Sequence, residues 1–599
     1  MRLEYLLIAE ATGMAGTMAR HFSERTTLPL QYLSDDLILF ANIPADVIDL
    51  PDRSGVIIGK IFHRNERSER VTLLPAGEGE LIHKTTGRRL IEEYWGSYIA
   101  AIPSQKGTHV LRDPSGGMPC YYVSEKHRTI FSSDVNILLN AARLRPVVDW
   151  EAVGRSLYFY QFPAEATALV GVSQIYGGEA LLVGPTGVEK SQCWNPWDHI
   201  NDKRTTGEEL GEQLCRIIRT TLSAWAAAYP RSLISLSGGL DSSIVASCLA
   251  TACSDIACLT VVTPDPVGDE RVYARAVSEA IGSKLIEILE QVELVDITNS
   301  VAERMPVPCG KAHERAYNEA IRKGVVQTCP DALFVGAGGD NVFYLTHSAR
   351  PLVDRFRAEG WSTGILQTLN DICTITGASA WQVIRESFRL IRMRNASIRW
   401  LTVPDYLSPE FVKTRCAEIA QHPWLNPPEG VPLGKIGHVT MLLRAMNHLE
   451  HRDKSLNIPM ISPLLSQPIV EFCLGVPSWE ACAGGKDRAV ARRAFERHLP
   501  PAVIRRGAKG SPDGWVAQFI AVHGPNIAHR LLDGELVRHG ILDRSAIEAI
   551  LRPGVKLAPT DAPRLMALLD AEAWVRHWLS LEAFGSERTS ESSVVKFDD

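Results

Sequence analysis

A glycine turn between an apolar strand and a helix is the feature of this sequence that most restricts its fold. Residues 233–243 read Leu-Ile-Ser-Leu-Ser-Gly-Gly-Leu-Asp-Ser-Ser. The apolar beginning predicts a buried strand, and residues 243–252 have the apolar spacing of a helix. Two glycines let the backbone turn sharply and approach a ligand, and the free N–H groups at the start of a helix attract anions. The segment therefore predicts a phosphate-binding unit, with an ordinary capped helix as the alternative.

A carboxylate in this turn adds a requirement for a cation. Asp241 would by itself repel a phosphate group, so its presence implies a bridging Mg²⁺, which pairs carboxylate with phosphate oxygens. The hydroxyl groups of Ser237, Ser242 and Ser243 supply further hydrogen-bond donors. The sequence therefore predicts that this turn binds a phosphate group together with Mg²⁺.

The rest of the chain divides into a β-rich first part and an α/β second part. Short apolar segments at residues 37–40, 98–102, 108–111 and 121–123 are separated by turn residues, and residues 171–188 predict a hairpin. From residue 230 onward, predicted strands alternate with predicted helices, which indicates a parallel sheet with helices on both faces. The 599 residues are too many for one hydrophobic core, and the chain from 350 to 585 is mostly helical in pattern.

The composition excludes several classes of protein. Hydrophobic residues make up 45% and charged residues 22%, which is typical of a globular protein. The net charge of −6 argues against a nucleic-acid partner, and the 12 cysteines lack the spacing of a metal or redox site. No apolar run reaches the ~20 residues that span a bilayer, and Glu4 and Glu10 interrupt the apolar start. We therefore expect a cytoplasmic protein that contacts no membrane.

The glycine turn resembles the pyrophosphate loop of the ATP pyrophosphatases, which transfer AMP to a carboxylate or carbonyl group. Residues 336–343, Gly-Ala-Gly-Gly-Asp-Asn-Val-Phe, resemble a second element that asparagine synthetases carry. The resemblance implies an adenine nucleotide α-hydrolase-like domain that uses ATP and Mg²⁺, with Asp241 and Asp340 as metal ligands. Asp340 could otherwise be an ordinary acid at a helix start. The ATP-binding residues that it implies are Leu236, Ser237, Gly238, Gly239, Leu240, Asp241, Ser242, Ser243 and Gly336.

Four further residues are candidates for catalysis through the same resemblance. Residues 499–510 resemble a family segment whose lysine faces the α-phosphate; Arg506 fits its pattern directly, and Lys509 fits if one residue is inserted. The expected role is stabilisation of negative charge in the transition state, against the alternative of a solvated loop lysine. Glu450 and His451 lie where the family places catalytic residues and could take the proton of an attacking amine, although a structural role is the alternative.

The first part resembles the glutaminase domain of class II asparagine synthetases, which implies an Ntn-hydrolase-like β-rich sandwich. Residues 96–98, 112–116 and 131–134 carry this resemblance. That class uses an N-terminal cysteine as nucleophile, whereas position 2 is Arg2 and no cysteine precedes Cys120. We therefore expect a vestigial domain at 1–205 that makes no ammonia, a synthetase domain at 206–586 and a flexible tail at 587–599.

Two acidic residues of the asparagine synthetases are replaced in this chain, and these replacements limit the reactions that we expect. Ala337 and Pro459 stand where asparagine synthetases have glutamates, which argues against asparagine synthesis and against the β-lactam synthetases. The remaining pattern resembles the cyclases that close the macrolactam ring of lasso peptides. This implies adenylation of an Asp or Glu side chain in a linear precursor peptide and attack by its N-terminal amine, with a leader peptidase as a second partner. We expect the peptide-binding surface within residues 345–450.

Three other functions remain open. An ammonia-dependent asparagine synthetase, or another ligase of small molecules, is the nearest. A non-catalytic nucleotide-binding relative belongs to a different class, and the two predicted metal carboxylates argue against it. A tRNA-thiolating ATP pyrophosphatase is disfavoured by the acidic composition and by the absence of a catalytic cysteine pair.

Overall fold

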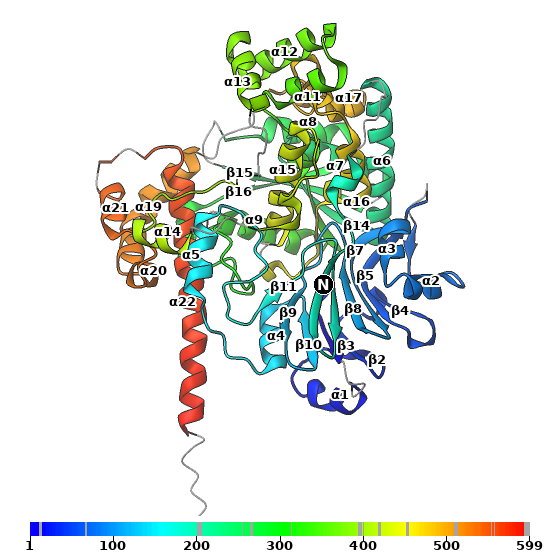
Figure 1. Ribbon diagram of the computed structural model, residues 1–599. Helices are drawn as coiled ribbons and strands as arrows, with labels where there is room; N and C mark the ends of the chain where they lie inside the picture. Colours follow the sequence, from blue (N-terminus) through cyan, green and yellow to red (C-terminus); the bar gives the residue numbers. More distant parts are fainter. Residues whose placement is uncertain are drawn as a thin grey trace, which may run out of the picture.

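Figure 1 shows the chain as an antiparallel β region joined to a larger α/β and helical region. The computed structural model describes residues 1–10, 15–65, 69–200, 207–253, 255–263, 268–312, 314–392, 398, 400–416, 421–450, 454–507, 513–552, 554–555 and 557–591. The β region, in blue and cyan, lies below the parallel sheet, and the helices drawn in green, yellow and orange surround that sheet (Figure 1).

Two antiparallel sheets make up the first part of the chain. Their strands are β1 (Tyr5–Glu10), β2 (Leu30–Leu33), β3 (Leu37–Ala41), β4 (Val47–Asp49), β5 (Val56–His63), β6 (Arg70–Val71), β7 (Tyr94–Ser104), β8 (Gly107–Arg112), β9 (Tyr121–Ser124), β10 (Arg128–Ser132), β11 (Ser173–Gln174), β12 (Glu179–Gly184) and β13 (Gly187–Gln192). The first sheet has the order β11-β9-β10-β1-β3-β2, and the second has the order β13-β12-β8-β7-β5-β4, with β6 paired to β5.

An apolar core lies between these two sheets and holds them together as a sandwich. Leu7 of β1 and Leu39 of β3 belong to the same buried cluster as Ile58 of β5, Ile99 of β7 and Val110 of β8. Because side chains alternate along a strand, each sheet turns every second residue into this cluster. The predicted strands and the hairpin formed by β12 and β13 are confirmed, and so is the β-rich sandwich.

A parallel sheet organises the second part of the chain. Its strands are β14 (Arg231–Ser235), β15 (Asp255–Val262), β16 (Lys284–Leu289), β17 (Ala332–Val335) and β18 (Met460–Ile461), in the order β16-β15-β14-β17-β18. Leu233 and Ile234 are neighbours in β14, yet they belong to different apolar clusters. Leu233 lies with Ile321 of α9 (Glu314–Thr328), and Ile234 lies with Ile244 of α7 (Leu240–Ala252). The predicted parallel sheet with helices on both faces is therefore confirmed.

The remaining chain is mostly helical, as the sequence predicts. The helices that matter below are α5 (Trp150–Tyr158), α8 (Arg271–Ala280), α10 (Gly339–Val342), α11 (Arg350–Glu359), α14 (Pro409–Arg415), α15 (Leu433–Glu450), α16 (Gln467–Gly475), α17 (Ala489–Phe495) and α22 (Asp561–Glu591). Helix α22 continues to Glu591, so residues 587–591 of the predicted tail are helical, while residues 592–599 lie outside the described part. The predicted domain boundary at 205 also falls outside it, between the antiparallel and the parallel sheets.

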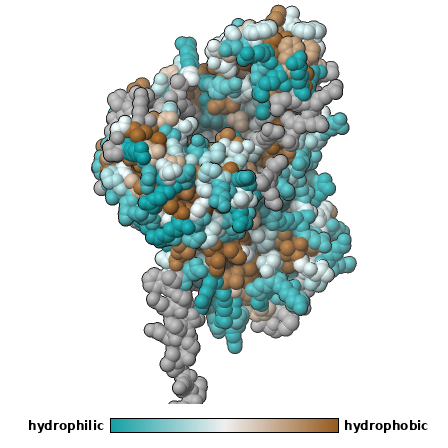
Figure 2. Space-filling model, turned by 60° about the vertical axis from the view of Figure 1, so that its left-hand side comes forward, coloured by the Kyte–Doolittle hydropathy of each residue, from teal (hydrophilic) through white to brown (hydrophobic). Residues whose placement is uncertain are grey.

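The surface is mainly polar where Figure 2 shows it, and hydrophobic residues form separate patches there. Among the described helices, none combines the length and the apolar character needed to cross a bilayer.

A partly buried carboxylate on α16, that of Glu471, joins the β region to the rest of the chain. Glu471 accepts hydrogen bonds from Arg64 at 2.8 and 2.9 Å and from the indole nitrogen of Trp194 at 2.8 Å. Gln467 adds a fourth bond at 2.8 Å. Although burial opposes the charged form of Glu471, the Arg64 guanidinium keeps the pKa of this carboxyl below its ordinary value. Arg64 and Trp194 are both in the β region, so this contact fixes the junction.

We expect the Glu471→Ala variant to unfold at a lower urea concentration than the wild type. The substitution leaves Arg64 and Trp194 without their acceptor in a place that water reaches poorly, which costs about 2–4 kcal/mol. Glu92→Ala is the matched control, because Glu92 pairs with Arg88 at 3.0 Å on the exposed surface. Its effect should stay within about 0.5 kcal/mol. Equal urea midpoints for the two variants would contradict the importance of this junction.

Candidate active site

The glycine turn lies between β14 and α7, where the sequence predicts it. Gly238 has a φ of +70°, and a Cβ atom there would lie 2.4 Å from Cβ of Tyr273 and 2.6 Å from the backbone nitrogen of Ala274. Only glycine fits this close contact with α8. The Ser237 and Ser242 hydroxyl oxygens lie 3.2 Å apart, at the start of α7. The turn therefore places hydroxyl and N–H donors at a helix start, as anion binding requires.

A second turn, between β17 and α10, packs directly against the first. A Cβ atom on Gly336 would lie 2.5 Å from the backbone nitrogen of Ser242, and one on Gly339 would lie 2.4 Å from Cγ of Asp241. Strands β14 and β17 are parallel neighbours, so their carboxyl ends lie at the same edge of the sheet. This close packing brings Asp340, in the first turn of α10, next to Asp241.

A single guanidinium group contacts both of these aspartates. Nη1 of Arg488 lies 3.2 and 3.1 Å from the two carboxylate oxygens of Asp241 and also hydrogen-bonds Asp340. Asp487 holds the other side of Arg488 by accepting from Nε at 2.8 Å. Burial disfavours the charge of Arg488, but Asp241, Asp340 and Asp487 together raise its pKa above the ordinary value. Arg488 is only 5% exposed, so this contact is a buried ion cluster.

The convergence of two carboxylates on one positive nitrogen shows that this place fits a cation. Carboxylate oxygens are the ligands that Mg²⁺ prefers, and the neighbouring turn offers donors for phosphate. Asp241 and Asp340 would therefore hold Mg²⁺ here, as the sequence predicts. Arg488 was not predicted, and the sequence around it gives no sign that it meets the two aspartates.

Arg506 lies against the outside of the glycine turn. Its guanidinium forms an ion pair with Glu270, stacks 4.0 Å from the ring centroid of Tyr273, and has Nη1 3.5 Å from the carbonyl oxygen of Gly238. Arg492 of α17 supports the same segment by donating to the carbonyl oxygen of Arg506 at 3.0 Å. Arg506 therefore holds the glycine turn and the beginning of α8 in contact with each other.

The other catalytic candidates cannot be placed with their side chains. Lys509 and His451 lie outside the described residues, and of Glu450 the structure describes only the backbone, at the end of α15. Helix α15 itself is tied to the second turn. Asn341 donates to the carbonyl oxygen of Met441 at 2.7 Å, and the buried, neutral His438 ring lies 2.9 Å from the carbonyl oxygen of Val342. Glu450 therefore ends a helix that contacts the Asp340 turn.

Two family models match the sequence. Residues 231–579 match the family described as asparagine synthase, and residues 78–194 match the glutamine amidotransferase domain. These matches agree with the two resemblances on which the expected synthetase and glutaminase-like domains depend. No curated protein sequence matches the chain significantly.

Two solved structures show weak similarity to the chain. Glutamine phosphoribosylpyrophosphate amidotransferase from B. subtilis, complexed with ADP and GMP, has 9% identity and a TM-score of 0.21 over 47% of this chain and 65% of its own. A structure of the allosteric regulatory enzyme of purine biosynthesis has 8% identity and a TM-score of 0.19. The match covers 48% of this chain and 74% of that enzyme. The matched region is thus less than two thirds of the first of these proteins.

Proposed function

Because the chain belongs to the asparagine synthase family, and is therefore an ATP-dependent amide-forming ligase, we propose that it closes a macrolactam ring in a linear peptide. In this proposal the ring joins an Asp or Glu side chain to the N-terminal amine of the same peptide. A leader peptidase acting on the precursor would expose that amine. The proposal also requires ATP as the second reactant and Mg²⁺ as the cofactor.

The convergence of Asp241, Asp340 and Arg488 at the glycine turn is the observation that carries the adenylation step. The N–H groups at the start of α7 and the hydroxyls of Ser237 and Ser242 would hold the phosphates. When bound, Mg²⁺ would neutralise phosphate charge while Asp241 and Asp340 hold it. Arg488 is then close enough to offer its own charge to the same phosphates.

The proposed reaction has two displacements. An oxygen of the peptide's side-chain carboxylate attacks the α-phosphorus of ATP, the bond to the bridging oxygen breaks, and pyrophosphate leaves. The N-terminal nitrogen then attacks the acyl carbon of the adenylate, AMP leaves with the bonding electrons of the acyl–oxygen bond, and a base takes the proton of the amine. Glu450 and His451 are our candidates for that base.

Three sequence features favour a peptide ring over asparagine as the product. Ala337 and Pro459 stand in place of two family acids, and no cysteine precedes Cys120 to serve as the glutaminase nucleophile. In the structure Cys120 is buried, so it does not replace that nucleophile at an accessible place. The first domain would then supply no ammonia, and the amine must come from the substrate itself.

Pyrophosphate release tests the proposed function directly. Purified protein with ATP and Mg²⁺ is given a panel of linear peptides of about 15 residues, each with a free amine and one Asp or Glu. We expect pyrophosphate and a product lighter than its peptide by one water, detected by mass spectrometry. Release with aspartate and ammonium alone would instead establish the small-molecule ligase, and ATP binding without release would establish the non-catalytic relative.

Lys509→Ala should lower turnover far more than it weakens ATP binding. A lysine that faces charge developing in the transition state contributes about 10²-fold to kcat and little to the ground state. Steady-state pyrophosphate release gives kcat and the KM for ATP separately. Lys413→Ala is the control, because Lys413 is exposed on α14. An unchanged kcat in Lys509→Ala would remove this lysine from the site.

A further inference from the structure

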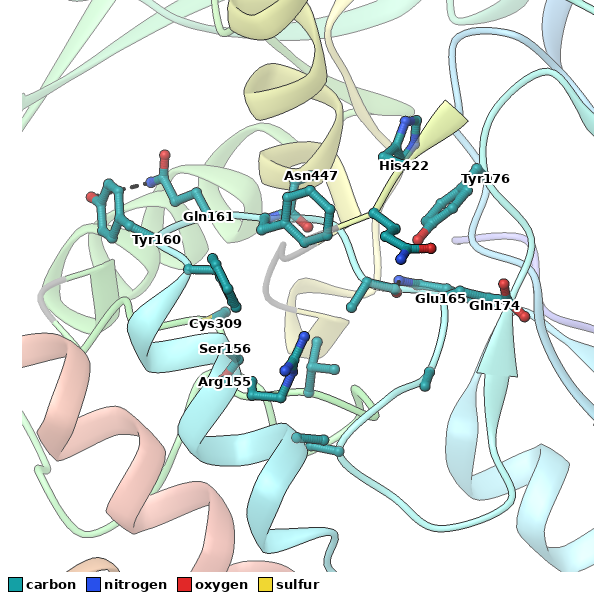
Figure 3. Close-up of a pocket in the computed structure, with 18 of the residues that line it drawn as sticks. Arg155, Ser156, Tyr160, Gln161, Glu165, Gln174, Tyr176, Cys309, His422 and Asn447 are labelled. Atoms are coloured by element: carbon teal, nitrogen blue, oxygen red, sulfur yellow. Dashed lines mark hydrogen bonds between the residues drawn. The ribbon is translucent and has the colours of Figure 1, made fainter. Parts of the chain in front are cut away.

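A cavity of about 1360 Å³ lies between the β region and the helical region (Figure 3). Its wall combines α5 and the chain that follows it with parts of β12, β13, α15 and α22. Figure 3 shows Arg155 and Ser156 on one side and His422 and Tyr176 on the other. The lining includes none of the residues of the glycine turn, so this cavity is separate from the nucleotide site.

Uncharged amide side chains distinguish the wall of this cavity. The amides in the lining are Gln161, Gln174, Gln192, Gln421, Asn426 and Asn447. Each carboxamide offers both an acceptor and donors, the same combination that a peptide unit offers. The wall also includes the aromatic rings of Tyr160, Phe162 and Tyr176. Such a surface complements the backbone and apolar side chains of a polypeptide.

Three cationic side chains of the wall are already engaged by neighbouring groups. Lys190 forms an ion pair with Glu165, and Lys311 lies 3.3 Å from Glu314. Arg564 directs its guanidinium to three backbone carbonyl groups, at 2.7, 3.0 and 3.0 Å. A small dianion such as a nucleotide would need several free cationic donors, and the donors of these three side chains are already committed to acids or carbonyl groups.

Two buried polar groups point to a ligand with hydrogen-bonding groups. Asn447 is 4% exposed, and its residue is part of the cavity wall. A ligand in the cavity could hydrogen-bond this carboxamide, which offers both an acceptor and donors. Burial lowers the pKa of His422 to about 3, so this ring is neutral. Its Nδ1 accepts from the backbone nitrogen of Trp424 at 3.1 Å, which leaves Nε2 as a donor.

Helix α15 connects the cavity wall to the Asp340 turn. Asn447 follows Met441 by six residues on α15, and Met441 is hydrogen-bonded to Asn341, the neighbour of Asp340. At 1.5 Å of rise per residue, the cavity wall is about 9 Å along the helix from that contact. A peptide segment that leaves the cavity along α15 would therefore run towards the Asp340 turn.

We propose that this cavity holds an uncharged stretch of the peptide substrate, chiefly through its backbone amides. This inference rests on the proposed function and names the place where the substrate is held. The volume exceeds the about 300–1,000 Å³ of sites for small ligands, and aspartate would fill only a small part of it. Residues 421–447 contribute, but much of the wall belongs to the β region, outside the 345–450 range that the sequence predicts.

Blocking the cavity tests this inference. Ala166 is exposed in the wall, and Ala166→Trp would place an indole in the hollow. We expect at least about tenfold weaker binding of a fluorescein-labelled peptide from the panel, measured by anisotropy, with an unchanged KM for ATP. Ala358→Trp, on the exposed side of α11, is the matched control and should bind the peptide like the wild type.

A second variant and a second probe keep the inference testable if Ala166→Trp does not fold. Asn447→Leu keeps the branching and the number of side-chain heavy atoms and removes the amide, so it should weaken peptide binding while its thermal unfolding stays near that of the wild type. A peptide carrying benzoylphenylalanine should crosslink to the segments that line the cavity. If the wild type cyclises peptides while both variants keep its affinity, the cavity assignment is wrong and the function stands. If the wild type uses only aspartate, the proposed function fails and this inference fails with it.

Discussion

Asp241→Asn should abolish ATP-dependent pyrophosphate release, with a loss of at least about 10³-fold in kcat/KM. The Asp241 carboxylate is 7% exposed and lies against Gly339, so a larger substituent would not fit, whereas asparagine has nearly the same shape. Asparagine keeps one acceptor oxygen, replaces the other by an NH2 donor and removes the charge that would hold Mg²⁺ beside the phosphates. Asp340→Asn should have the same effect, because both carboxylates face the same cationic nitrogen.

Asp331→Asn is the matched control for this prediction. Asp331 precedes β17 at the other end of the same strands, where it pairs with Arg231 at 2.6 Å on the exposed surface. We expect this variant to keep wild-type activity. Full pyrophosphate release by Asp241→Asn or by Asp340→Asn would contradict the metal-binding role of that residue. Circular dichroism and the urea midpoint show whether each variant is folded.

The fold was predictable where local sequence alone decides the structure. The apolar run before the glycine turn predicts β14, and the glycine pair predicts the turn, because the positive φ of Gly238 is a conformation that few other residues adopt. The alternation of strands with helices likewise predicts the parallel sheet. The tail shows the limit of this reasoning: its serine-rich composition does not reveal that α22 extends to Glu591.

The candidate site was predictable only in part. Asp241 and Asp340 each follow a recognisable glycine-rich turn, and the pairing of β14 with β17 brings those turns together. Arg488 lies 247 residues from Asp241 in the sequence and has a φ of +49°, so neither its contact nor its backbone follows from a local pattern. The cavity is equally non-local, since α5 and α15 meet there only through the packing of the whole chain.

Arg488→Met should separate the two roles of the buried guanidinium. Without it, Asp241 and Asp340 repel each other in a poorly solvated place, so we expect the free energy of unfolding to fall by about 2–4 kcal/mol in the absence of divalent cations. Mg²⁺ should restore most of this loss in the variant, because it can then bind without displacing an arginine. In the wild type, Mg²⁺ alone should change the unfolding midpoint little, since Arg488 already occupies the space between the carboxylates.

The affinity for Mn²⁺ and the turnover of Arg488→Met are the second and third measurements that test this prediction. Mn²⁺ titrated into nucleotide-free protein and followed by electron paramagnetic resonance should bind Arg488→Met about tenfold more tightly than the wild type. Turnover should fall about 10²-fold, because a positive charge near the phosphates is lost. Arg493→Met, on the helix α17 that follows Arg488 but facing Glu480 at 3.6 Å, should change neither quantity. If Mn²⁺ binds the wild type and Arg488→Met equally, the guanidinium does not compete with the cation, and the two aspartates must bind the metal on a side that Arg488 leaves open.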